Sequence, residues 1–358
     1  MKFLEVLGNW INRYFSHEEA IYLIVFLVGA FVVLFTLGGV LAPVLTGLVL
    51  AFLLQGLVSR LQGMGLPRGL CVYLTFLLFL GGMVALILFL VPLVWRQSVA
   101  LANALPDLIG RLREMAKDLA ASSPQLVTPE QLDAWLEAMA GDVGHLSGDV
   151  VQVLLNQVPS LVGWVIYIIL VPLAVFFFLK DKDALLGWFL SLLPGKRPML
   201  DRVGAEMNLQ IANYVRGKFI EILLVGAATF VAFTVLGLNY AALLGVLVGL
   251  SVLVPFIGAS VVTIPVVVVA VLQFGWTWDG FLVIGVYLVI QMLDGNVLVP
   301  LLFSEAVDLH PINIIVAVLV FGGLWGFWGV FFAIPLATLV KAIYNAWPRG
   351  EVFQQPDA

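Results

Sequence analysis

The sequence FIEILLVGAATFVAFTVLGL occupies residues 219–238 and opens the stretch that decides the fold. From Phe219 to Val340 the chain carries no lysine or arginine. The charged side chains of this stretch are five carboxylates: Glu221, Asp279, Asp294, Glu305 and Asp308. Soluble domains are about 25% charged, so this stretch has too few charges to cover a surface in water. We therefore expect it to be surrounded by lipid.

The whole chain has the same character. Of its 358 residues, 62% are hydrophobic and only 11% are charged, and the mean hydropathy is +1.11. Because only helices and closed barrels satisfy their backbone in lipid, and helical spans need roughly 20 residues, we predict an all-α polytopic integral membrane protein with about eight transmembrane helices. Its first apolar run starts at Ile21 without a small-residue cleavage site, so we do not expect a cleavable signal peptide.

Charge asymmetry predicts the orientation. The stretch 180–218 has seven basic and four acidic residues, whereas 96–159 has four basic and eight acidic residues. Cytoplasmic loops are enriched in lysine and arginine, so both chain ends and 180–218 are expected in the cytoplasm. The predicted order is a cytoplasmic N-terminus (1–20), three spans (21–95), an external amphipathic-helix segment (96–159), one span (160–179), a cytoplasmic amphipathic-helix segment (180–218), a C-terminal transmembrane bundle (219–343) and a cytoplasmic tail (344–358).

Within the first of these regions, the apolar block Ile21–Val58 is too long for one span. It is interrupted around Gly38, Gly39 and Pro43, so we predict two closely spaced helices there. A third span is expected over Leu70–Val94.

Two later segments are interrupted near their middle. Ala241–Gln273 contains VPFIG at 254–258, and Ile312–Ile343 contains GGLWGFWG at 322–329. Paired broken helices at membrane depth are typical of transport sites, although glycines also let helices pack closely. The backbone positions that we single out are Pro255, Gly258, Gly322, Gly323, Gly326, Gly329 and Pro335.

Two topologies fit these broken segments. Each segment is either one kinked span, which makes eight spans, or a re-entrant hairpin, which makes six spans and two hairpins. The loops beside them contain no basic residue, so the positive-inside rule does not choose between the two. We favour the kinked spans, because glycine and proline commonly interrupt single spans.

The polar candidate of greatest interest is Asp294, which lies in the apolar run Phe281–Leu302. Gln291 lies one helical turn before it, and Asn296 lies two residues after it. A carboxylate with amide neighbours at membrane depth can bind a cation or carry a proton. The alternative is a protonated aspartate that hydrogen-bonds a neighbouring helix.

Three further polar residues are candidates for transport or ion binding. Glu221 is expected to pair with Lys218 at the membrane interface. Arg216 lies on the amphipathic helix that leads into the same span. His310 precedes Pro311, and it is either a helix-start residue or a proton carrier.

Catalytic and nucleic-acid signatures are absent from the sequence. There is no glycine-rich phosphate loop that ends in Lys-Ser or Lys-Thr, and no nucleophile–base pair is evident. The single cysteine, Cys71, and the three histidines have no metal-ligand spacing. We therefore expect no enzyme activity, no cofactor, no metal site and no nucleic-acid partner.

Several motifs together resemble the autoinducer-2 exporter family of bacterial membrane proteins, and especially its PerM permease branch. The likeness covers nearly the whole chain. The motifs are FFFLKDKD at 176–183, NYVRGK at 213–218, VPFIG at 254–258, DGNVLVP at 294–300, DLHP at 308–311 and FGGLWGFWGVFFAIPLA at 321–337. Where this chain has Asp294, the family often has glutamate, so the charge is kept on a shorter side chain.

The resemblance implies a multi-pass secondary transporter of the bacterial inner membrane, with 96–159 in the periplasm. Some family members are linked to export of autoinducer-2, and others to sodium or lithium/proton antiport. The expected partners are therefore the lipid bilayer, a small polar solute or a monovalent cation or proton, and further copies of the chain in a homo-oligomer. A membrane scaffold that uses its external helices is a third, non-transport hypothesis.

Overall fold

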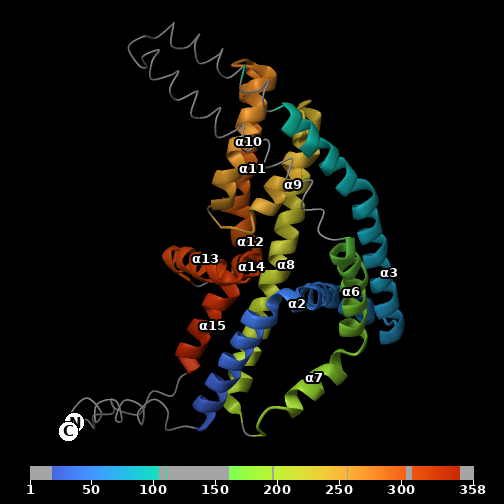
Figure 1. Ribbon diagram of the computed structural model, residues 1–358, viewed down its shortest axis with the longest axis vertical. Coiled ribbons are helices and arrows are strands. Elements are labelled where there is room, and N and C mark those ends of the chain that lie inside the picture. Colours follow the sequence, from blue (N-terminus) through green and yellow to red (C-terminus); the bar gives the residue numbers. More distant parts are fainter. Residues whose placement is uncertain are drawn as a thin grey trace, which may run out of the picture. The chain divides into compact units, whose positions relative to one another are not determined.

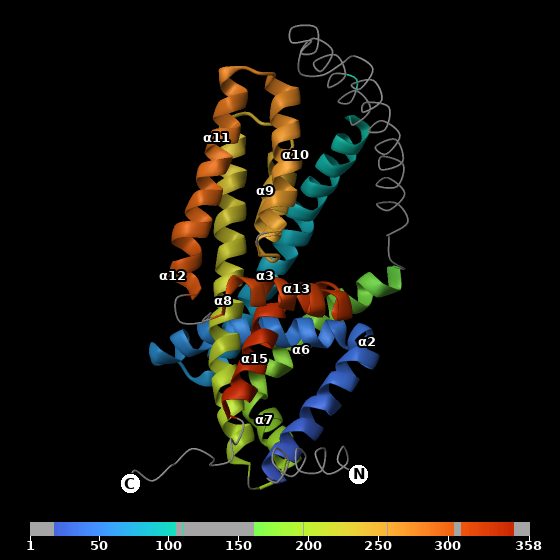
Figure 2. The same ribbon diagram turned by 90° about the vertical axis from the view of Figure 1, so that its left-hand side faces the viewer.

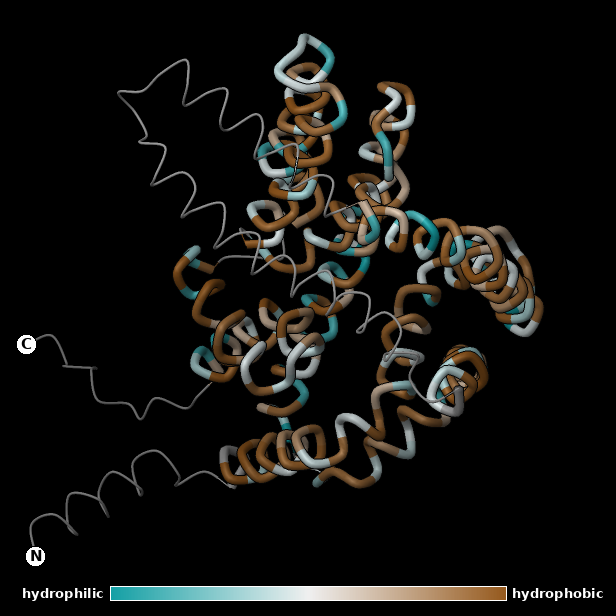
Figure 3. Tube along the Cα trace, turned by 45° about the horizontal axis from the view of Figure 1, so that its top comes forward, coloured by the Kyte–Doolittle hydropathy of each residue, from teal (hydrophilic) through white to brown (hydrophobic). Residues whose placement is uncertain are grey.

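The computed structural model describes residues 18–104, 110, 161–195, 197–255, 257–303 and 309–346. Every regular element in these residues is a helix, and none of them forms a strand (Figure 1). Six helices of this part are long and apolar enough to cross a membrane, and three shorter apolar helices accompany them. Hydrophobic residues run along most of the helical trace in Figure 3. The predicted all-α polytopic membrane fold is therefore confirmed.

The chain divides into two compact units, each assembled from segments that are distant in sequence. Unit 1 comprises Met1–Phe76, Ile169–Gly217 and Leu302–Ala358, and unit 2 comprises Leu77–Ile168 and Lys218–Leu301. Four helices contribute residues to both units: α3 (Arg68–Ala85), α6 (Leu161–Lys180), α8 (Pro198–Val235) and α12 (Val299–Phe303).

Unit 1 begins with one long helix, α2 (Glu18–Gly63), which contains Pro43. The prediction of two separate helices for Ile21–Val58 is wrong, because this stretch lies within one continuous helix. Instead, the ribbon of α2 changes direction sharply part-way along its length (Figure 2). Proline removes a backbone hydrogen bond and bends a helix without ending it. Gly47 of α2 lies against Ala174 of α6, where a side chain would collide.

The amphipathic segment 180–218 forms two helices. The short helix α7 (Lys182–Ser191) follows α6 directly, and Asp183 on α7 pairs with Arg68 at the start of α3. The predicted amphipathic helix that runs into a span is confirmed, because α8 continues from Pro198 to Val235 without a break.

Unit 1 ends with a helical hairpin, named hairpin 2 and comprising residues 311–346. It consists of α13 (Pro311–Trp325), α14 (Phe327–Phe331) and α15 (Ala333–Ala346). Gly326 makes the turn with a φ of 58°, a conformation that favours glycine. Both α14 and α15 pack on α13, so the segment folds back on itself.

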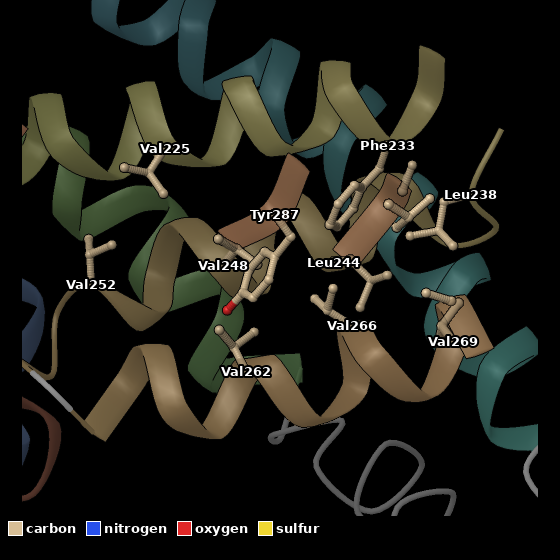
Figure 4. Close-up of a cluster of buried hydrophobic side chains, with 13 residues drawn as sticks. Val225, Phe233, Leu238, Leu244, Val248, Val252, Val262, Val266, Val269 and Tyr287 are labelled. Carbon is tan, nitrogen blue, oxygen red and sulfur yellow. The ribbon is translucent and has the colours of Figure 1, made fainter. Parts of the chain in front are cut away.

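The core of unit 2 lies among α8, α9 (Ala241–Ser251), α10 (Ile257–Phe274) and α11 (Trp278–Leu293). Figure 4 shows its apolar side chains, with Phe233 and Tyr287 at the centre. The helix that begins as α3 passes through a π-helical turn (Leu86–Leu90) and continues to residue 104. Gln97 on this continuation accepts a hydrogen bond from the backbone N–H of Leu243 on α9.

The first broken segment, residues 241–274, is a helical hairpin, named hairpin 1. Helices α9 and α10 lie side by side (Figures 1 and 2). The Gln273 side chain bonds the carbonyl oxygen of Gly237 and the N–H of Asn239, each at 2.7 Å. The two ends of the hairpin therefore lie next to each other. Our preference for single kinked spans is wrong for both segments, which form hairpins.

Several predictions fall outside the described residues. These are the N-terminal residues 1–17, most of the external segment 96–159, Phe256 within VPFIG, the loop 304–308 and the tail from 347 onward.

Candidate functional site

A buried ion pair lies on the inner face of α8 in unit 2. Lys218 and Glu221 are one helical turn apart, and the Lys218 Nζ lies 2.8 Å from Glu221 Oε2. Their side chains are only 6% and 2% exposed. The predicted pairing is present, but it lies inside the protein, whereas we expected it at the membrane interface.

The Lys218 ammonium has a second partner at the turn of hairpin 1. Its Nζ donates a hydrogen bond of 2.8 Å to the backbone carbonyl oxygen of Val252, which directly follows α9. The carbonyl groups at the end of a helix have no partner in that helix, so a lysine from another helix satisfies one of them. Lys218 therefore joins α8 to the turn of hairpin 1.

A row of polar side chains runs along one face of α11. Tyr287, Gln291 and Asp294 are spaced four and three residues apart, so they share a face. The Tyr287 hydroxyl lies 2.8 Å from the hydroxyl of Thr263 on α10 and 3.3 Å from the backbone carbonyl oxygen of Ala259. Gln291 Nε2 and Asp294 Oδ1 are buried without a hydrogen-bond partner among the described residues.

Asp294 lies within electrostatic range of the ion pair on α8. Its carboxylate is attracted by Lys218 and repels Glu221. Asp294 is half-buried, and its Oδ1 can accept a hydrogen bond or bind a cation. We name Lys218, Glu221 and Asp294 the charge cluster.

The backbone at Asp294 is also unusual. Asp294–Leu298 forms a π-helical turn between α11 and α12 (Val299–Phe303). Single π turns inside helices are rare and are frequent at functional sites. Asn296 lies on this turn, but it is exposed and donates its amide to the carbonyl of Met292 at 2.9 Å. Of the two amide side chains near Asp294, Gln291 therefore lies on the same helix face as Asp294, whereas the Asn296 amide bonds the backbone of its own helix.

The other polar candidates, Arg216 and His310, belong to unit 1. Arg216 is exposed, and its guanidinium lies beside Gly56 of α2. His310 caps the start of α13, where its Nδ1 accepts a hydrogen bond of 3.3 Å from the N–H of Ile312. His310 therefore lies at a helix start, and its role as a proton carrier stays a prediction.

Several of the glycine and proline candidates lie where the backbone of a hairpin turns or approaches another part of the same hairpin closely. Pro255 lies in the turn of hairpin 1, and a Cβ added to Gly258 would overlap the carbonyl oxygen of Ser251. In hairpin 2, a Cβ on Gly329 would overlap the carbonyl oxygen of Phe321. A Cβ on Gly322 would lie 2.9 Å from the Val330 side chain. These glycines allow the close packing that we considered as the alternative to a transport site.

Three remaining positions contribute differently to hairpin 2. Gly326 forms its turn, as described above, whereas Gly323 has no atom within 4 Å of an added Cβ. Pro335 is buried in the first turn of α15.

Comparison with known proteins identifies the family. The model of the AI-2E family transporter matches residues 21–349, which is almost the entire chain. The chain belongs to the AI-2E transporter family. The resemblance drawn from the motifs is confirmed.

Comparison with individual proteins gives the same result as comparison with the family model. The chain is 46% identical to the permease PerM of Escherichia coli (strain K12) over 352 residues, which cover 98% of this chain and 100% of PerM. It is 27% identical to the transport protein YueF of Bacillus subtilis (strain 168) over 290 residues, 80% of this chain and 78% of YueF. These matches support a role in membrane transport, and they specify no substrate.

From the sequence we did not predict two features of this site: the burial of Lys218 and the position of Tyr287 beside Gln291 and Asp294. Lys218 was expected at the interface because it is the last basic residue before an apolar run, and a lysine at such a position usually reaches back to water. Tyr287 was overlooked, although its spacing from Gln291 and Asp294 could have indicated a shared helix face.

Proposed function

We propose that this AI-2E family member is an ion-coupled secondary transporter, and that the charge cluster binds a proton or a monovalent cation such as sodium or lithium. The observation that carries the proposal is the imbalance of charge in the cluster. Glu221 pairs with the ammonium of Lys218, and the second carboxylate, Asp294, lies within electrostatic range of the same ammonium. With all three groups ionised, the cluster has one negative charge more than it has positive charges.

An uncompensated charge in a membrane interior is costly. One proton or one monovalent cation neutralises the cluster, and a second of the same kind would overcompensate it. Protons and cations therefore compete for the same place. Such competition is the physical basis of exchange between the two.

The groups around the cluster fit this chemistry. Asp294 Oδ1 is an oxygen donor without a hydrogen-bond partner in the described residues, and carboxylate oxygens are suitable ligands for hard cations. Lys218 also bonds Val252 at the turn of hairpin 1. A change of charge in the cluster would alter the strength of this bond, which offers a route from ion binding to movement of the hairpin.

The proposal includes location and orientation. We place the protein in the bacterial inner membrane with both ends and residues 180–218 in the cytoplasm, because of the distribution of basic residues. Residues 96–159 are then periplasmic. The export of a small polar solute remains compatible with the same coupling ion, and the proposal does not depend on it.

The test uses the full chain in liposomes that contain a pH-sensitive dye. Addition of sodium or lithium chloride outside should move protons through wild type, whereas Asp294→Asn should behave like protein-free liposomes. Asn296→Ala is the matched control, because it changes a polar side chain on the same π turn that bonds only its own helix in the structure. It should retain wild-type exchange.

Two results would overturn the proposal. Wild type that moves no protons with either cation would exclude antiport of sodium or lithium. Equal exchange by wild type and Asp294→Asn would show that the carboxylate of Asp294 is structural.

A further inference from the structure

A second site lies in unit 1, where α7 packs beside α2. A cavity of about 470 Å³ opens between these helices, with one wall from Phe178 of α6. Its inner side is apolar, and Ala51 at this side is only 4% exposed. The volume is in the range of pockets that hold small ligands, about 300–1,000 Å³. The charge cluster belongs to unit 2, so this cavity is a different site.

The helix α7 has the properties of a helix at a membrane surface. It follows directly after α6, which is a candidate span that ends at Lys180. Its large apolar side chains are exposed, with Trp188 at 64% and Leu186 at 51%. Tryptophan is enriched at the membrane–water boundary, and amphipathic helices lie there with their apolar face in lipid. The cavity is therefore continuous with the expected level of the lipid headgroups.

The polar groups of the cavity favour an anion. Lys182 is the one ionisable side chain that lines it in the part of the chain that the structure describes. The main partner of the adjacent carboxylate, Asp183, is Arg68, although Asp183 is also attracted by Lys182. The side-chain amides of Gln55 and Asn208 complete the lining and can donate hydrogen bonds to ester or phosphate oxygens.

We propose that this cavity is a binding site for an anionic phospholipid. One acyl chain lies along the apolar inner side, against Phe52 and Phe178. The phosphate binds the ammonium of Lys182, which is exposed and so lies at the mouth. Basic pockets between helices on the cytoplasmic side of a membrane bind anionic headgroups in this way. The inference does not depend on ion coupling by the charge cluster, and it rests on the proposed function only for the cytoplasmic orientation of residues 180–218.

The experiment uses Trp188, which lines the cavity, as the reporter. The full chain in neutral detergent is titrated with phosphatidylglycerol that carries bromine on its acyl chains, because bromine quenches nearby tryptophans. The chain has ten tryptophans, so the signal of Trp188 is taken as the difference between wild type and Trp188→Phe. Brominated phosphatidylcholine, with the same acyl chains and no net charge, is titrated in parallel.

The Trp188 signal should fall saturably with phosphatidylglycerol and at a higher concentration with phosphatidylcholine. Lys182→Gln should weaken the binding of phosphatidylglycerol by about fivefold, the effect of one lysine near an anionic surface, whereas Lys182→Arg should restore it. Lys180→Gln is the matched control, because this lysine lies over the Phe176 ring at 5.7 Å and does not line the cavity. It should bind phosphatidylglycerol like wild type.

Four outcomes would overturn the proposal. Equal quenching by both lipids would show that the site does not select an anion. Unchanged affinity in Lys182→Gln would remove the lysine from the site. Absence of saturable quenching at Trp188 would show that no acyl chain enters. Competition by glycerol phosphate that is as strong as competition by unbrominated lipid would identify a site for phosphate alone, which also contradicts the acyl-chain assignment.

Discussion

Replacement of Lys218 by methionine is expected to destabilise the protein strongly. The change removes the ammonium that lies 2.8 Å from Glu221 and leaves a carboxylate that is only 2% exposed. Removal of one partner from a buried ion pair costs about 3–5 kcal/mol. The carbonyl oxygen of Val252 also loses its donor, and an unsatisfied buried group costs about 1–3 kcal/mol. Both costs come from the loss of the same ammonium, so they are not fully additive. We therefore expect the free energy of unfolding to fall by about 5 kcal/mol, the upper end of the range for a broken buried ion pair.

The cause of this loss can be separated from simple packing by a double-mutant cycle. The double variant Lys218→Met with Glu221→Leu replaces both charges by apolar groups of similar size, which is often near neutral for a buried pair. It should retain the cost of the unsatisfied Val252 carbonyl and of the lost attraction between Lys218 and Asp294. Glu221→Leu alone also removes one partner of the buried pair and should cost about 3–5 kcal/mol. The coupling energy between the two positions should therefore be at least about 3 kcal/mol, the upper end of the values measured for contacting residues. Equilibrium unfolding in mixed micelles with increasing SDS, followed by tryptophan fluorescence, provides the four free energies.

The exposed ion pair Arg197–Asp201 supplies the control. Its N–O distance is 3.0 Å, but the side chain of Asp201 is 61% exposed. Asp201→Asn should therefore change the free energy of unfolding by about 1 kcal/mol at most. A loss in Lys218→Met that is no larger than this value would refute the argument, because it would mean that water reaches the Lys218–Glu221 pair.

Three further predictions concern the glycine contacts, an exposed ion pair and hairpin 1. A Cβ on Gly249 would lie 2.8 Å from a backbone carbonyl of α8, so Gly249→Ala should lower the unfolding free energy by about 1–3 kcal/mol. In contrast, Gly285→Ala has open space around it and should raise this energy by about 0.5–1 kcal/mol; equal effects would contradict the close contact. The hydrogen bond from Arg68 lowers the pKa of Asp183 in the folded state. The ion pair therefore stabilises the folded state at pH values above the pKa that Asp183 has in the unfolded chain. This contribution is lost as the pH falls through the pKa of Asp183 in the folded state. Thermal unfolding across a pH series should therefore show Asp183→Asn less stable than wild type at neutral pH and equal to it in acid, and a difference that persists in acid would contradict this origin. Cysteines at Asn239 and Gln273, in a chain without its native cysteine, should be joined by a short thiol cross-linker, whereas a single span would hold them roughly 30 Å apart and give no product.

The composition alone determined that this protein is helical and lies in a membrane. A stretch from Phe219 to Val340 without a basic residue is incompatible with a water-covered surface, and lipid leaves few ways to satisfy the backbone. The sequence also indicated the pairing of Lys218 with Glu221, because residues three apart share a helix face. The importance of Asp294 followed from the cost of its charge in an apolar run, and its role stays a prediction.

The tertiary structure decided how the interrupted segments fold. Glycine and proline permit both a kinked span and a hairpin, and the adjacent loops carry no basic residue to indicate a side. The hairpin results from contacts between its two ends and across its turn: the bond between Gln273 and Asn239, and the close approach of Gly258 to Ser251. The burial of Lys218 likewise depends on Val252, which lies far along the chain. Local periodicity does not contain this information, because such partners meet only when helices pack.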